Sequence, residues 1–271
     1  MDSDQGTDMK ISEWTADRED TMKNEYDNET FFNQYAQMSR SREGLAGAGE
    51  WHQLKEMFPP LAGKKVLDLG CGYGWHCEYA AEQGAAQILG IDLSERMIAE
   101  AKKRNTNERI TYRVSDLENY EYPEETWDCV ISNLALHYIE SLNNVYRNVY
   151  RTLNPGGTFL FNIEHPVFTA REGQDWIYDE KGNPMYWPVD EYFYSGRRHT
   201  RFLGCDVEKY HHTLTQILNG LIRNGFEIEW VEEARPSEDM MQIPDMKDEM
   251  RRPMMLMVRA KKKEEICHAG R

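Results

Sequence analysis

The sequence contains 271 residues, of which 40% are hydrophobic, enough for one large α/β domain or for a core domain with a small cap. Its net charge is −15, so the basic surface typical of nucleic-acid-binding proteins is not expected. No apolar run approaches the roughly 20 residues of a membrane-spanning helix, and the acidic N-terminus is unlike a secretory signal. We therefore expect a cytoplasmic protein, monomeric or homodimeric, that binds neither nucleic acid nor membrane.

Free thiols and no metal site are expected from the cysteine and histidine pattern. The five cysteines are odd in number and form no C-x-x-C motif, which is typical of a reducing compartment. His211 and His212 are adjacent, so their side chains should point apart, and no other spacing is typical of zinc.

The N-terminal 60 residues divide into two parts. The first 25 are charged and carry few large apolar groups, which predicts a flexible segment or a loose helix. Residues 26–60 are rich in aromatic and aliphatic side chains, which predicts a helical segment that packs on the rest of the chain and ends at Pro59-Pro60.

A regular alternation of strands and helices follows. The apolar runs predict strands at 65–69, 87–91, 110–114, 127–132 and 158–163. The intervening segments predict helices at 75–83, 94–105 and 142–153, the second capped by Ser94. Alternating strands and helices predict a parallel sheet with helices on both faces. Residues 61–164 are thus assigned to one half of a Rossmann-like domain.

The alternation stops after residue 164. Residues 165–212 are aromatic-rich and too long for a simple connection, which predicts an inserted cap. Residues 213–263 then close the core with a helix at 214–224, which the His211-His212 pair would open, and strands at 226–232 and 253–260. Residues 264–271 are expected to be a tail.

The turn after the first strand carries the most informative motif, VLDLGCGYG. Asp68 ends the strand, and Gly70, Cys71 and Gly72 begin a turn in which glycines let the backbone approach a ligand closely. Cys71 is interpreted as a small residue that fits the turn, not as a nucleophile.

A dinucleotide-binding fold is the competing interpretation. Its fingerprint is G-x-G-x-x-G, whereas the glycines here run G-x-G-x-G. Asp68 would also repel bound phosphates. The pattern therefore favours a cofactor that bears an ammonium group and no phosphate.

Polar residues also follow the next three strands. Asp92 ends the second strand and is suited to ribose hydroxyls. Ser115, Asp116 and Leu117 end the third strand, and Asn133 and Leu134 end the fourth. The carboxyl ends of parallel strands share one edge of the sheet, so these groups should form a single site.

In order and spacing, these motifs resemble the class I S-adenosylmethionine (SAM)-dependent methyltransferases. The matching stretches are VLDLGCGYG, ILGIDLSERMI, VSDLE, WDCVISNLALHYI and VYRTLNPGGTFLFNIEHP, within residues 64–164. The resemblance implies a doubly wound, seven-stranded, mostly parallel α/β sheet whose last strand is antiparallel. It also implies S-adenosylhomocysteine as the product.

Roles for individual residues follow from the resemblance. Asp68 and the turn of Gly70, Cys71 and Gly72 would hold the amino-acid end of SAM, and Asp92 would bind the ribose. The residues implied around the adenine and the sulfonium are Leu93, Met97, Ser115, Asp116, Leu117, Asn133 and Leu134.

The N-terminal stretch FFNQYAQMSRSREGLAGAGEW resembles the lid of a bacterial branch of small-molecule methyltransferases. In that resemblance Tyr35 and Arg40 fold over SAM. The Asp/Asn-Pro-Pro-Tyr motif of many DNA and protein amide N-methyltransferases is absent after the fourth strand.

Three histidines are candidate catalytic groups. His165 is the preferred general base, since imidazole titrates near neutral pH, and a turn residue before proline is the alternative. His137 faces either the substrate or the backbone, and His211 is the third candidate. Aromatic residues 176–194 either line the substrate site or form the core of the cap or an oligomer interface.

The predicted function is methyl transfer from SAM to an O, N or C nucleophile of a small molecule. A SAM-binding regulatory subunit without turnover and a protein or tRNA methyltransferase are the alternatives.

Overall fold

The computed structural model describes residues 25–244 and 246–264. The predictions for the first 24 residues and for most of the tail therefore lie outside the described residues. None of the helices in the described part of the chain combines the length and apolar character that crossing a lipid bilayer requires.

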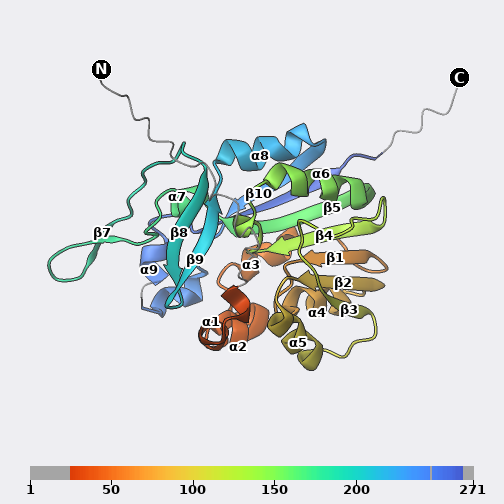
Figure 1. The fold of residues 1–271 in the computed structure, drawn as a ribbon, viewed down its shortest axis with the longest axis horizontal. Coiled ribbons are helices and arrows are strands. Elements are labelled where there is room, and N and C mark those ends of the chain that lie inside the picture. Colours follow the sequence, from red (N-terminus) through yellow and green to blue (C-terminus); the bar gives the residue numbers. More distant parts are fainter. Residues whose placement is uncertain (1–24, 245, 265–271) are drawn as a thin grey trace, which may run out of the picture.

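A mixed sheet forms the centre of the molecule (Figure 1). Its strands are β1 (Lys65–Leu69), β2 (Gln87–Asp92), β3 (Ile110–Val114), β4 (Trp127–Asn133), β5 (Leu153–Glu164), β10 (Phe226–Glu233) and β11 (Met255–Lys262). They form a seven-stranded sheet in the order β10-β11-β5-β4-β1-β2-β3. The strand β11 runs antiparallel to both of its neighbours, β10 and β5, and the other neighbouring pairs in this sheet are parallel. The predicted Rossmann-like sheet with an antiparallel last strand is confirmed.

The burial pattern of each strand matches its central or edge position in the sheet. Four of the five residues of β1 are buried, and β2 and β4 show similar runs, as expected for strands covered on both faces. The edge strand β10 instead alternates between more and less exposed residues. The predicted strand at 158–163 begins earlier, at Leu153, because β5 continues through the Asn154-Pro155-Gly156-Gly157 stretch.

Helices cover both faces of the sheet. The helices α4 (Trp75–Glu82) and α5 (Glu95–Arg104) supply Cys77, Ala80 and Ile98 to the apolar layer on one face. The helices α6 (Leu142–Thr152) and α8 (Leu214–Arg223) supply the layer on the other face. Figure 1 shows α6 and α8 together along one side and α5 on the opposite side.

The remaining elements gather beside the sheet. The N-terminal segment forms η1 (Glu25–Asp27), α1 (Glu29–Tyr35), α2 (Ser39–Arg42), η2 (Gly44–Gly47), α3 (Trp51–Leu54) and η3 (Lys55–Met57). The segment after β5 forms α7 (Pro166–Thr169), β6 (Ile177–Tyr178), β7 (Pro184–Tyr186), β8 (Gly196–Phe202) and β9 (Cys205–His211). Shorter elements are η4 (Leu136–Tyr138), η5 (Glu238–Gln242) and α9 (Met246–Glu249).

The hairpin of β8 and β9 brings the cap toward the N-terminal helices. Phe31 of α1 contacts Phe202 of β8 edge to face, with ring centroids 5.9 Å apart. The expectation that His211 and His212 open a helix was wrong: His211 ends β9, and α8 begins at Leu214 because Thr213 and Gln216 form a capping box there.

Candidate active site

The turn between β1 and α4 has the backbone geometry that the glycines were expected to allow. Gly70, Gly72 and Gly74 all have a positive φ, at 74°, 51° and 80°. A Cβ on Gly74 would lie 2.3 Å from the Tyr112 hydroxyl oxygen, whereas a Cβ on Gly72 would meet nothing within 4 Å. The turn thus leaves open space above Gly72, where a ligand could approach the backbone.

Asp68 lies beneath this turn with one carboxylate oxygen without a partner among the described residues. Asp68 is only 1% exposed, and its Oδ2 accepts a hydrogen bond from the Cys77 thiol at 3.3 Å. No hydrogen bond to Oδ1 is made within the described part of the chain. Burial raises the pKa of Asp68 to about 7. A buried carboxylate oxygen without a donor fits a ligand that supplies an ammonium group.

Asp92 at the end of β2 is held by the backbone. Its two oxygens accept hydrogen bonds from the amides of Gly72 and Ser94, at 2.8 and 2.9 Å. Burial raises its pKa to about 6, although both backbone donors lower it. Each carboxylate oxygen retains a second lone pair, so Asp92 can still accept hydrogen bonds from two ribose hydroxyls.

The residues predicted around an adenine lie near the ends of β2 and β3. Leu93 is 40% exposed, whereas Met97 of α5 is buried. The amide of Ser115 donates to the Asp92 carbonyl at 2.9 Å, which joins the ends of the two strands. Asp116 accepts hydrogen bonds from the Glu118 amide and the Asn119 side chain. The loop residue Leu117 packs against the core.

Asn133 and Leu134 lie where β4 meets the glycine turn. Leu134 has a φ of 55°, a left-handed conformation that is uncommon for residues other than glycine. Its amide donates a hydrogen bond to the Asn162 carbonyl at 2.8 Å, which holds this conformation. A Cβ on Gly70 would lie 2.4 Å from the Cβ of Ala135. The loop after β4 therefore lies directly against the turn after β1.

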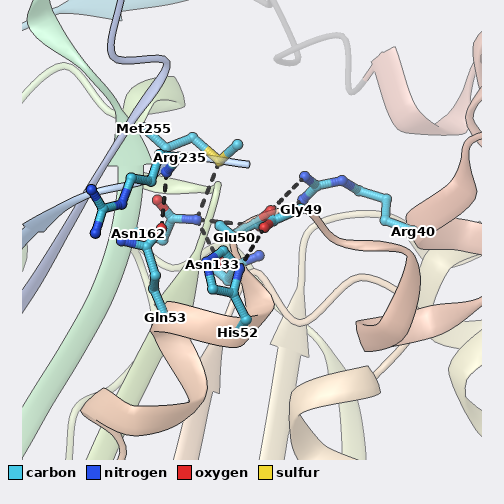
Figure 2. A network of polar contacts seen from close by, with 9 residues as sticks. All are labelled: Arg40, Gly49, Glu50, His52, Gln53, Asn133, Asn162, Arg235 and Met255. Carbon is cyan, nitrogen blue, oxygen red and sulfur yellow. Dashed lines mark hydrogen bonds and ion pairs between the residues drawn. The ribbon is translucent and has the colours of Figure 1, made fainter. Parts of the chain in front are cut away.

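A polar network joins the N-terminal helices to the ends of β4 and β5 (Figure 2). Arg40 of α2 makes a two-pronged ion pair with the buried Glu50, with both contacts at 3.2 Å. The Asn162 side chain donates to Asn133 at 3.0 Å and to Glu50 at 3.4 Å. Tyr35 lies near Arg40, and burial raises the pKa of Tyr35. The structure thus brings Arg40 and Asn133 into one network.

A second cluster lies at the end of β5, beneath the cap hairpin. The side chains of Glu164, Lys209 and His137 are each less than 10% exposed. Lys209 donates to Oε1 of Glu164, and Nε2 of His137 lies 3.9 Å from the same oxygen. Burial would raise the pKa of Glu164, but His137 and Lys209 outweigh it and lower that pKa. Burial lowers the pKa of His137 to about 4, so its imidazole is neutral at pH 7.

Aromatic side chains from three parts of the chain surround this cluster. The hydroxyls of Tyr26 and Tyr138 lie 3.0 Å apart. The Lys209 ammonium lies 5.1 Å from the ring centroid of Phe202, which in turn contacts Phe31. The ring of Tyr138 contacts those of His137 and Tyr26, with centroids 4.5 and 5.9 Å away. Tyr35 contacts both Tyr26 and Tyr73 of the turn after β1. The aromatic group therefore connects the Glu164 cluster to the glycine turn.

The other two candidate histidines have both ring nitrogens in contact with the protein. His165 accepts a hydrogen bond from the Val167 amide at Nδ1, and its Nε2 lies 3.0 Å from a Glu233 oxygen. In His211, Nδ1 lies 2.7 Å from the Thr169 hydroxyl and Nε2 lies 2.8 Å from the Tyr192 carbonyl. These contacts favour structural positions for both. Burial raises the pKa of Cys71 to about 11, which also disfavours a thiolate there.

Aromatic residues of the segment 176–194 pack around Arg252 or are exposed to solvent. Trp176 and Trp187 pack around Arg252, whose guanidinium lies 5.6 and 4.4 Å from their ring centroids. Phe193 and Tyr194 are 86% and 76% exposed.

Sequence reasoning did not select Glu164, Lys209, Tyr26 or Glu50. Only Lys209 had a readable signal: with Val207 and His211 it occupies alternate positions of β9, so a lysine falls on the buried face of a hairpin.

Comparisons with known proteins agree with this geometry. Residues 67–161 match a family described as a methyltransferase domain. A Listeria monocytogenes structure assigned as a SAM-dependent methyltransferase is 50% identical, with 82% of this chain and 100% of that chain covered and a TM-score of 0.78. A Mesorhizobium loti SAM-dependent methyltransferase is 42% identical, with 80% and 100% covered and a TM-score of 0.75.

Curated relatives match at lower identity. An uncharacterised Haemophilus influenzae protein is 32% identical over 88% of this chain and 97% of its own length. A phosphoethanolamine N-methyltransferase of Triticum aestivum is 35% identical over 44% of this chain, which spans only 25% of that protein. A malonyl-[acyl-carrier protein] O-methyltransferase of Bacillus cereus is 33% identical, with 42% and 43% covered. The strand-end site and the full-length matches together show that this chain belongs to the SAM-dependent methyltransferases.

Proposed function

We propose that this enzyme methylates a small molecule. The observation that supports the proposal is the enclosure of the Glu164, Lys209 and His137 cluster, which lies beneath the cap hairpin and beside aromatic side chains of the N-terminal segment. A protein or nucleic acid would need an open groove to reach groups that are buried this deeply. The relatives include a phosphoethanolamine N-methyltransferase and a malonyl-[acyl-carrier protein] O-methyltransferase, so both N and O nucleophiles remain open.

The cofactor-binding roles are part of this proposal. Asp68 would receive the ammonium group of SAM above the glycine turn, and Asp92 would hold the ribose. Leu93 and Met97 would border the adenine, with residues 115–117 opposite them. Asn133 and Leu134 would lie beside the reactive centre, because the loop that carries them packs on the turn.

Bound SAM supplies a methyl group already activated by its positive sulfur. The chain's own residues then have to align the acceptor and exclude water, and well-oriented approach alone can lower a barrier by roughly 7–11 kcal/mol. Tyr35, Arg40 and the N-terminal helices would close over the cofactor, since Arg40 is already tied through Glu50 and Asn162 to the ends of the central strands.

Calorimetry with SAM tests the cofactor site. The variant Asp92→Ala should weaken binding by about 100-fold or more, since two hydrogen bonds to a charged acceptor contribute roughly 3–6 kcal/mol. Gly72→Ala should also lose binding, because its new methyl group enters the open space above the turn.

Gly63 offers a matched control for the glycine substitution. It has a φ of 73° and, like Gly72, nothing within 4 Å of its Cβ position. Both alanine variants should lose about 1–2 kcal/mol of stability from the left-handed backbone, but Gly63→Ala should bind SAM normally. Equal affinity in wild type, Asp92→Ala and Gly72→Ala would refute the site.

Methyl-labelled SAM tests the acceptor class. The enzyme is incubated with a bacterial cell extract that ultrafiltration has divided into small-molecule and macromolecular fractions. We expect label in the small-molecule fraction only. Label in protein or RNA would favour a macromolecular substrate, and tight SAM binding without transfer to either fraction would favour a regulatory subunit.

A further inference from the structure

The Glu164 carboxylate has one oxygen engaged and one without a partner. Oε1 accepts from Lys209, whereas Oε2 is buried and receives no hydrogen bond within the described residues. Burying a carboxylate oxygen without a donor is costly, so such an atom in a native site marks a position for a ligand that donates a hydrogen bond. His137 presents a second buried atom of this kind, Nδ1, from the neighbouring element η4.

The ion pair with Lys209 determines which donor fits. An isolated buried carboxylate would bind an ammonium ion, which has no lone pair and cannot attack a methyl group. Lys209 neutralises Glu164, and His137 is uncharged at neutral pH, so the cluster as a whole has no net charge. It can therefore accept an N–H hydrogen bond without strongly favouring the protonated form of the donor.

The aromatic group completes the site. The ring of Tyr138 contacts His137 on one side and Tyr26 on the other, and the Phe202 ring lies over Lys209. Aromatic faces attract the positive charge that develops on a nitrogen as it gains a methyl group. The same faces carry partial negative charge and so disfavour a carboxylate.

We propose that the methyl acceptor is an amine, bound through an N–H to the free oxygen of Glu164, with Lys209 as the residue that positions and neutralises this carboxylate. The inference rests on the proposed small-molecule function. The amine nitrogen forms the new bond to the methyl carbon, and the carbon–sulfur bond breaks with its electron pair left on sulfur. The resulting ammonium keeps its proton, since the lowered pKa of Glu164 makes this carboxylate too weak a base to take it, and releases the proton to solvent after the product has left.

An alcohol acceptor would need a stronger base than the cluster contains. Glu164 has a lowered pKa, that of His137 is about 4, and the pKa of Tyr138 is raised. His212, behind His137, also has a lowered pKa. An amine that binds in its unprotonated form attacks through its own lone pair, so none of these groups has to remove a proton before attack.

The first experiment identifies the bond that is formed. Wild-type enzyme, methyl-labelled SAM and the small-molecule ultrafiltrate are incubated together, and mass spectrometry locates the label in the products. Three added probes share one skeleton: benzylamine, benzyl alcohol and benzoate. We expect N-methyl products, and benzylamine as the only methylated probe if any of the three is used.

Variants of Glu164 and Lys209 are then assayed with the acceptor that the first experiment identifies. Glu164→Gln should lower kcat/KM by about 10- to 100-fold, the loss expected for one hydrogen bond to a charged acceptor, with SAM affinity unchanged in calorimetry. Lys209→Met should raise the pKa of Glu164, so the acid limb of the kcat/KM profile should move to higher pH. Each unit of that movement lowers the rate on the limb about tenfold, and Lys209→Arg should restore the profile.

Two outcomes would overturn the inference. Ether or methyl ester products would show a different acceptor while leaving the methyltransferase function intact. Full activity in the neutral double variant Glu164→Gln/Lys209→Met, which leaves no unpaired charge and should fold, would exclude the roles of both residues. Absence of any product with normal SAM binding would instead refute the proposed small-molecule function.

Discussion

Asp68 is a buried residue whose ionisation lowers the stability of the folded chain. Burial raises its pKa to about 7, whereas an unperturbed aspartate titrates near 3.8. The folded state therefore holds this proton more tightly than the unfolded chain. The associated stability is fully present below the unfolded pKa and is lost as the pH rises toward 7. The charged form, which in the proposed site would pair with the ammonium group of SAM, is the less stable form in the free protein.

The variant Asp68→Asn should separate these two effects. At pH 8 the variant should be more stable than wild type by a few kcal/mol, because each unit of raised pKa corresponds to about 1.4 kcal/mol. It should therefore unfold at a higher temperature. At pH 5 the difference should be smaller, because Asp68 is then protonated in the folded state although it is still ionised in the unfolded chain, and below pH 3.8 it should vanish. Calorimetry should show weaker SAM binding by the variant at pH 8.

Asp206→Asn is the control for this comparison. Asp206 is exposed on β9, so its substitution should change neither the pH dependence nor SAM binding. If wild type and Asp68→Asn lose stability equally between pH 5 and pH 8, the buried carboxylate is not the cause.

At the scale of elements, the β8–β9 hairpin carries polar side chains on its buried face. Arg198 donates to the carbonyls of Ala170 and Tyr194, at 2.9 and 2.6 Å. His211 joins the Thr169 hydroxyl to the Tyr192 carbonyl. These bonds fix the loop before β8, so the hairpin holds its position above Glu164 through hydrogen bonds as well as apolar contacts.

His211→Ala should therefore act on the hairpin and not on proton transfer. The loss of its buried hydrogen bonds should cost about 1–3 kcal/mol, and hydrogen exchange of residues 191–194 should become faster. The pH profile of kcat/KM should keep its shape. His199, exposed on β8, is the matched control, and His199→Ala should change stability by less than about 0.5 kcal/mol. A lost limb in the His211→Ala profile would identify a general base instead.

Elements were predictable where burial imposed a regular pattern. The strand Ile110–Val114 has the predicted bounds, and the predicted helix at 214–224 exceeds α8 by one residue. In the cap, β6 and β7 are too short to show any periodicity. The pairing of Glu164 with Lys209 joins residues 45 positions apart, and no local pattern specifies such a contact.

At the scale of the whole molecule, a buried polar connection at Glu50 joins the N-terminal helices to the sheet. Glu50 receives Arg40 on one side and Asn162 on the other (Figure 2). The resemblance to a lid singled out Arg40 from the sequence, but its partner was not identified because Glu50 is one of many glutamates in the chain. The tertiary contact with β5 is what makes it distinct.

Glu50→Gln should loosen this connection more than it unfolds the core. The Arg40 charge would lose its partner, which costs about 3–5 kcal/mol when both groups are fully buried. A smaller loss is expected here because 20% of the Arg40 side chain is exposed. Hydrogen exchange should accelerate across residues 29–54 but not in β1 or β2, and SAM binding should weaken. The exposed neighbour Glu43 provides the control, since Glu43→Gln should leave both measurements unchanged. Uniform acceleration throughout the sheet would mean instead that the N-terminal helices unfold together with the core, so that Glu50 supports the whole fold and not a separable lid.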